Sequence, residues 1–113
     1  MLFASKVSGE GVYLASGADA TDVGSDIEFS LKDKWANNAI YDVVFTSLPA
    51  QPGYEQRAHG YLHVSGANVQ SVSNYGNCQP TFSGNTVDVN LVSWNNRAEV
   101  LITCDAEEFT VSK

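Results

Sequence analysis

The chain has 113 residues, of which 43% are hydrophobic and only 17% are charged. Thirteen acidic residues stand against six basic ones, which gives a net charge of −7, and Lys and Arg do not cluster. This charge argues against nucleic acid and anionic membrane surfaces as partners, and no apolar run is long enough to span a bilayer. The length predicts a single domain over residues 1–113.

The N-terminal segment, residues 1–6, lacks the basic start and long apolar core of a signal peptide. We expect the chain to be either the mature form of an exported protein or a chain that begins here and folds in the cytosol. Asp19, Asp22 and Asp26 follow in a segment rich in turn residues. Their oxygens suit a structural calcium ion, but the EF-hand pattern is absent. A solvated turn with Asx caps is the preferred interpretation.

Alternation of apolar and polar residues recurs along the chain and predicts short strands. Ile27, Phe29 and Leu31 alternate with polar neighbours, as do the apolar residues of 87–91 and 98–104. The segment 40–46 is apolar on both faces, which predicts a central strand. Strands are expected at residues 2–7, 12–15, 27–31, 40–46, 61–64, 69–72, 77–82, 87–91, 98–104 and 109–112.

Turn residues punctuate these strands at regular intervals. Asn95-Asn96 and Ser83-Gly84-Asn85 predict hairpins, and Lys32 to Asn38 tolerates one helical turn. Closely spaced strands of this kind are typical of a sandwich or barrel. The expected fold is an all-β, two-layer antiparallel β-sandwich, immunoglobulin-like or jelly-roll-like in shape, with about 8–10 short strands.

Two cysteines leave one intramolecular pair, Cys78–Cys104. Strand parity places both side chains in the core, so we expect a disulfide, which implies an oxidising compartment. Two buried free thiols are the alternative. Trp94 lies between the cysteines, but they are too close in sequence for the antibody-type bridge.

The only histidines, His59 and His63, share a predicted strand face with Tyr61. The strand spacing separates the two imidazoles too widely for one zinc ion, so no metal site is expected. An aromatic-and-imidazole binding strip is one interpretation of these residues. A plain polar outer face is the other.

Five aromatic residues fall in turns or on the wet parity of strands: Trp35, Tyr54, Tyr61, Tyr75 and Trp94. Such side chains beside Asn, Gln and Asp suit sugar rings or protein interfaces. Trp94 as a cap on the core is the alternative. The segment Pro49–Tyr54 contains two prolines, which restrict its backbone and suit a recognition loop or a plain crossover.

No catalytic motif is present. Asp105, Glu107 and Glu108 supply the two carboxylates that glycoside hydrolysis needs, but a solvated edge that blocks strand pairing explains them better. The nucleophile elbow and the phosphate-binding glycine motifs are absent. We expect neither an enzyme nor a cofactor.

The leading hypothesis is a non-catalytic, extracytoplasmic recognition module that binds a glycan or a protein. Its expected binding residues are Tyr54, His59, Tyr61, His63 and Trp94. A small inhibitor or immunity-type protein that blocks an enzyme with the loop Pro49–Tyr54 is the first alternative. A structural subunit of a cell-surface or virion assembly is the second. The oligomeric state is left open.

Overall fold

The computed structural model describes residues 26–113, which are built entirely from strands, turns and loops. Within this range no helix is long and apolar enough to cross a membrane. The expected strands at 2–7 and 12–15 lie outside the described residues, as do Asp19 and Asp22. The ten strands are β1 (Ile27–Trp35), β2 (Asn38–Phe45), β3 (Gln56–Ala58), β4 (Tyr61–Ser65), β5 (Val69–Gly76), β6 (Thr81–Ser83), β7 (Thr86–Asp88), β8 (Leu91–Ser93), β9 (Arg97–Cys104) and β10 (Thr110–Ser112).

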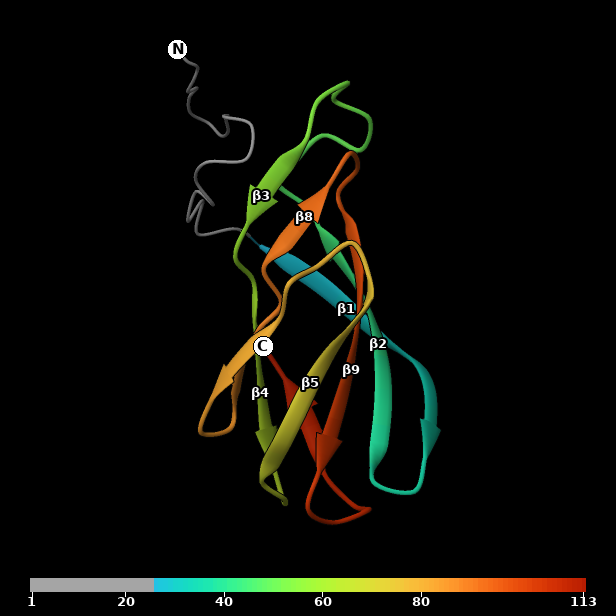
Figure 1. Cartoon of the computed structure of the whole chain (residues 1–113), viewed down its shortest axis with the longest axis vertical. Helices are drawn as coiled ribbons and strands as arrows, with labels where there is room; N and C mark the ends of the chain where they lie inside the picture. The colour runs from blue at the N-terminus through green and yellow to red at the C-terminus, as the bar shows by residue number, and fades with distance from the viewer. Residues whose placement is uncertain (1–25) are drawn as a thin grey trace.

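All strand pairs are antiparallel, so the all-β prediction is confirmed for this part of the chain. One four-stranded sheet has the order β1-β2-β9-β5, and a second has the order β10-β4-β7-β6. A small third sheet pairs β3 with β8 at one end of the elongated molecule (Figure 1).

Strand β2 is central, as its sequence predicts, because it pairs with β1 on one side and β9 on the other. Tyr41, Val43 and Phe45 point into the core, and Ile40, on the opposite face, is also buried. A strand with apolar residues on both faces suits this position, since neither face is fully open to water.

Among the described residues a single cluster of buried hydrophobic side chains draws on both larger sheets. The first sheet contributes alternate residues of β2 and β9, and the second contributes Leu62 and Val64 of β4 and Val87 of β7. Val87, Val89 and Leu91 are all completely buried, which confirms their predicted inward parity. The chain nevertheless breaks at Asn90, whose φ of 47° divides the expected single strand into β7 and β8.

Gly60 lies where the chain passes from β3 in the small sheet to β4 in the second sheet. A Cβ atom at this position would lie 2.6 Å from Ile27 Cγ2 and 3.0 Å from the Phe45 ring. Only glycine allows the backbone to approach the core this closely. The crossing between the two sheets therefore requires a residue without a side chain at position 60.

The predicted helical turn at Lys32–Asn38 is wrong. These residues form the end of a hairpin in which Trp35 pairs with Asn38 across the two-residue turn Ala36-Asn37. A bulge between Leu31 and Asp33 shifts the register of β1. Good helix formers are a weak signal here, because the neighbouring strand β2 supplies a hydrogen-bonding partner along the whole segment.

One predicted hairpin forms and the other does not. The turn Gly84-Asn85 joins β6 to β7 as expected, with Ser83 paired to Thr86. Asn95-Asn96 lies between β8 and β9, but β8 pairs with β3 while β9 pairs with β2 and β5. This turn therefore carries the chain from one sheet to another and does not close a two-stranded hairpin.

Strand parity misjudged two apolar residues at sheet edges. Phe82 shares the parity of Cys78 in the expected strand 77–82, which predicts an inward side chain, but it is 40% exposed because β6 is a three-residue edge strand. Leu31, on the edge strand β1, is 54% exposed for the same reason. The expected strand at 77–82 is reduced to Thr81–Ser83, and its expected first residue, Asn77, has a φ of 61°, which is not a strand conformation.

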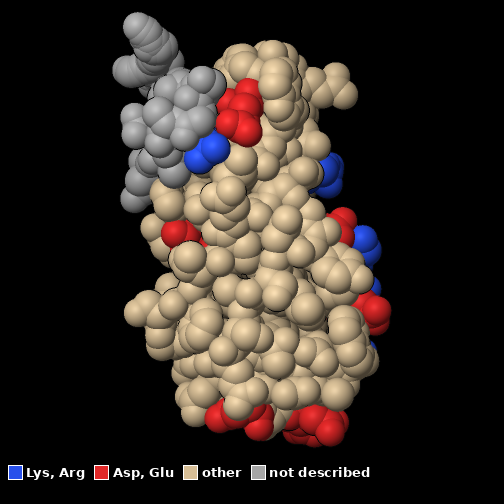
Figure 2. Space-filling model, viewed as in Figure 1, with Lys and Arg blue, Asp and Glu red and all other residues tan. Residues whose placement is uncertain are grey.

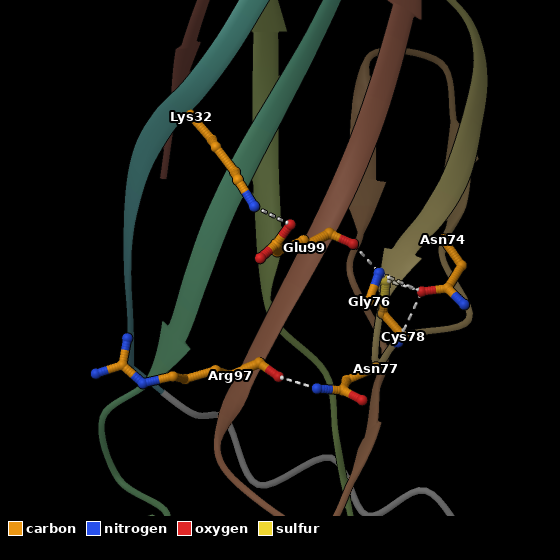
Figure 3. A network of polar contacts seen from close by, with 7 residues as sticks. All are labelled: Lys32, Asn74, Gly76, Asn77, Cys78, Arg97 and Glu99. Atoms are coloured by element: carbon orange, nitrogen blue, oxygen red, sulfur yellow. Dashed lines mark hydrogen bonds and ion pairs between the residues drawn. The ribbon is translucent and has the colours of Figure 1, made fainter.

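The predicted Cys78–Cys104 disulfide is wrong, because both thiols are free and buried. Cys78 Sγ lies 3.2 Å from the carbonyl oxygen of Glu99 (Figure 3). Glu99 lies on β9, and Cys104 is five residues further along that strand. At the usual rise per residue this separation is about 17 Å. A disulfide needs Cα atoms within about 7 Å of each other.

Parity correctly placed both cysteines in the core but did not specify their positions along it. The inference of an oxidising compartment depended on the disulfide, so the free thiols remove that argument for an extracytoplasmic location. Burial raises the pKa of both the Cys78 and the Cys104 thiols, which keeps them protonated and unreactive.

We predict that both thiols can be alkylated without reductant once the protein is unfolded. Intact mass after denaturing alkylation should increase by two adducts, and the native protein should react far more slowly. The slow native reaction follows from burial and the raised thiol pKa values. An unreduced protein whose mass does not change under denaturing alkylation would contradict the free-thiol structure.

Candidate functional site

The five aromatic side chains that the sequence marks as accessible are all exposed. Trp94 is the most exposed at 64%, and Tyr75, on β5, follows at 54%. They do not form one patch. Tyr54 and Trp94 lie near the small sheet, Tyr61 lies on β4, and Trp35 lies at the tip of the β1–β2 hairpin.

Trp94 lies on a turn, residues 93–97, that is held by its own polar groups. The Ser93 hydroxyl donates to Asn95 Oδ1 (2.9 Å), and the same oxygen accepts from the Arg97 amide (2.8 Å). The Asn95 amide donates back to Ser93 Oγ (3.0 Å). The turn is thus fixed while the indole of Trp94 remains in water.

The long loop 46–55, which contains the predicted Pro49–Tyr54 segment, is anchored beside this turn. Gln56 Nε2 donates to the Pro49 carbonyl (2.9 Å) and to the Asn95 carbonyl (3.1 Å). Figure 1 shows the loop projecting beyond the strands at the end of the molecule that carries β3 and β8. We call this surface, residues 46–55 and 93–97, the loop end.

A second buried amide, that of Asn96, connects the turn to β2. Its Nδ2 donates to the carbonyls of Phe45 (3.3 Å) and Leu48 (3.2 Å), and its own carbonyl accepts from the Phe45 amide (2.8 Å). Gln56 and Asn96 are at most 9% exposed. Hydrogen bonds from buried side-chain amides therefore hold both segments of the loop end.

The loop end carries little charge. Residues 46–54 and 91–96 contain no Asp, Glu, Lys or Arg. The charged neighbours Glu55 and Arg57 are in contact with each other at 3.4 Å. The turn carrying Trp94 ends at the exposed Arg97. The exposed surface around Trp94 and Tyr54 is thus mainly aromatic, prolyl and amide.

The remaining predicted residues, His59, Tyr61 and His63, lie on the open face of the second sheet. His59 precedes β4 and its ring stacks on Tyr61, with centroids 6.3 Å apart and planes 10° from parallel. His59 Nδ1 lies 2.7 Å from Asp88 Oδ2. The carboxylate of Asp88, itself bound by the Asn90 amide, thus holds the imidazole against Tyr61.

Hydroxyl groups continue this open face beyond Tyr61. His63 Nδ1 lies 3.1 Å from Thr86 Oγ1, and the hydroxyls of Ser65 and Thr110 are 2.8 Å apart. The face is therefore a flat polar surface of hydroxyls with one stacked pair of rings. Within residues 26–113 no group of three or more His, Cys, Asp and Glu side chains is placed to hold a metal ion.

Sequence patterns located the exposed aromatic residues but not the groups that hold them. Asp88 was on the wet face of a predicted strand and Thr86 lay just before it, and neither was linked to the histidines. Gln56 and Asn96 were missed, because a polar residue in a turn region is usually exposed.

Asp26, the one weak calcium candidate among the described residues, is exposed, and its main-chain carbonyl accepts a hydrogen bond from the Thr46 amide (3.0 Å).

Comparison of the chain with protein-family models, with curated proteins and with solved structures gives no match. Function is therefore inferred from the residues of the chain themselves.

We predict that Asn96→Ala destabilises the protein by about 1–3 kcal/mol, because the Phe45 and Leu48 carbonyls lose a donor in a buried place. Hydrogen exchange of residues 46–55 should accelerate. Gln51→Ala, an exposed change in the same loop, is the control and should change the free energy of unfolding by less than about 0.5 kcal/mol. Equal urea midpoints for both variants would show that the amide does not anchor the loop.

Proposed function

We propose that this chain is a non-catalytic recognition domain, a two-layer β-sandwich that binds a protein partner with its loop end. The observation that carries this proposal is Trp94, which is 64% exposed on a turn whose neighbouring polar groups bond to one another. A large aromatic side chain left in water loses the free energy that burial would provide. Binding a partner recovers it.

The fixed turn favours binding for a second reason. Ordering a flexible loop reduces affinity, whereas a loop already held in one conformation avoids that cost. Trp and Tyr are also the residues most enriched among those that dominate protein interfaces. Trp94 and Tyr54 are both exposed at the loop end, and Pro49 and Pro52 restrict the backbone of the loop beside them.

The chemistry of the loop end suggests the surface it fits. It projects from the strands and has almost no charge of its own, so it suits an apolar concavity on another protein. Blocking an enzyme's cleft, as an inhibitor or immunity-type protein does, is one form of such binding. An assembly subunit would use the same surface against a neighbouring subunit.

We predict that Trp94→Ala weakens partner binding by about 30-fold or more, the effect expected for a dominant interface residue. The immobilised domain would be used to capture proteins from an extract of the source cells. Captured proteins would be identified by mass spectrometry, purified and titrated against wild type and variant.

Tyr75→Ala is the matched control, because Tyr75 is as accessible as the loop-end aromatics but lies on β5. A purified partner should bind this variant with the affinity of the wild type. If the partner binds Trp94→Ala as tightly as wild type, the loop end is not the recognition surface.

The open face of the second sheet supports a second candidate, binding of a neutral glycan. The specific observation is the His59–Tyr61 stack beside Asp88, because an aromatic face next to a carboxylate can contact both the ring and the hydroxyls of a sugar. Ser65, Thr86 and Thr110 add hydroxyl groups nearby.

For this candidate we predict saturable binding of the wild type to neutral glycans on an array. Tyr61→Ala should abolish the signal, and Tyr75→Ala should leave it unchanged. An array without signal, or a signal that survives Tyr61→Ala, would count against glycan binding on this face and leave the protein-partner proposal unaffected.

A further inference from the structure

A groove lies at the end of the molecule opposite the loop end. Three segments that are far apart in sequence form it: the tip of the β1–β2 hairpin, the turn after β4 and the segment between β9 and β10. Its volume is about 870 Å³, within the range of about 300–1,000 Å³ usual for ligand sites. It is therefore large enough for several residues of a peptide.

Two aromatic rings are among the residues that line the groove. Trp35, the last residue of β1, is 44% exposed, and Phe109 is partly buried against the core. Lys34 Nζ lies 5.0 Å from the centre of the Phe109 ring. The Phe109 ring is thus covered by the Lys34 ammonium, whereas the Trp35 ring is exposed.

Among the described residues Lys34 is the only basic one that lines the groove, and its ammonium is hydrogen-bonded to the main chain. Its Nζ donates to the main-chain carbonyls of Ala36 (2.5 Å) and Glu107 (2.7 Å). Neither bond engages a carboxylate. The ammonium therefore joins the hairpin tip to the segment between β9 and β10, and its single charge offsets only one of the two groove carboxylates.

Those acidic side chains are Glu107 and Glu108, both exposed. Within residues 26–113 the close contacts between basic side chains and carboxylates join Lys32 to Glu99, Arg57 to Glu55 and His59 to Asp88, so neither groove glutamate has such a partner.

Asp105 is a third acidic residue in the segment between β9 and β10. Hydrogen bonds from the Asn68 amide and side chain hold the pKa of its carboxyl below the usual range. Figure 2 shows acidic atoms gathered at this end of the visible face and no basic ones there.

We propose that this groove binds a basic peptide segment, with an arginine side chain lying on Trp35 and facing Glu107 and Glu108. A guanidinium group stacks on an indole and pairs with carboxylates at the same time, which an ammonium group does less well. The excess of unpaired carboxylates attracts such a segment and repels an acidic one. The groove is distinct from the loop end, so this inference does not depend on the proposed function.

The test uses a capped peptide, Gly-Arg-Gly-Arg-Gly, titrated into the whole chain. Trp94→Phe serves as the background, because Trp35 is then the only tryptophan and its fluorescence reports the groove directly. We expect a saturable change that weakens as salt is added. The same peptide with Gln in place of Arg should give no change.

Two variants locate the site. Trp35→Ala should weaken binding about tenfold, measured by calorimetry. The double change Glu107→Gln with Glu108→Gln should weaken it about fivefold, and its thermal midpoint should be that of wild type because both side chains are exposed. Glu28→Gln removes an exposed carboxylate at the other end of β1 and should leave the affinity unchanged.

Several results would overturn the proposal. One is the absence of saturable binding at millimolar peptide. Another is an equal loss of affinity in Glu28→Gln, which would mean that the overall charge of the chain, and not the groove, attracts the peptide. Calcium chloride that saturates the Trp35 signal as well as the peptide does would indicate an inorganic cation site instead.

Discussion

The loop end depends on a two-way hydrogen bond between the backbone of Phe45 and the residue Asn96. The Phe45 amide donates to the Asn96 carbonyl (2.8 Å), and the Asn96 side chain returns a bond to the Phe45 carbonyl (3.3 Å). The Phe45 ring is completely buried and lies against Gly60. One residue thus connects the core, the crossing between two sheets and the turn that carries Trp94.

This arrangement explains how a fixed surface forms where regular pairing has ended. Beyond β2 and β8 no strand of residues 26–113 pairs with the backbone of these loops, so side-chain amides supply hydrogen-bond partners there. Not every polar atom of these two amides is hydrogen-bonded, because Gln56 Oε1 is buried with no partner within the described residues. An unpaired buried acceptor reduces stability, yet the loops remain anchored through the other atoms of the two amides.

Local alternation predicted much of the fold because each buried strand face leaves a period-two signal. It indicated the central strand β2, the inward residues of β9 and the exposure of Trp94. It did not predict which strands lie at sheet edges, and Phe82 is exposed for that reason. Parity placed Cys78 and Cys104 inside, but only pairing shows that they lie at opposite ends of the β5–β9 ladder.

The surfaces were predicted unevenly for similar reasons. Exposed aromatics can be recognised from a turn or a wet strand face, so Trp94 and Tyr61 were found. The groove beside Trp35 could not be predicted, because it joins segments that only the folded sheets bring together. The charge of the acidic segment 105–108 and the exposure of Trp35 were visible in the sequence, but their meeting in one groove was not.

The most direct test of the account is amide nitrogen relaxation of the turn 93–97 in solution. A turn held by Asn95 and Asn96 should give backbone order parameters near about 0.85, as in the core strands. Values below about 0.6 at Trp94 and its neighbours would show a mobile turn. The preformed recognition surface would then be contradicted.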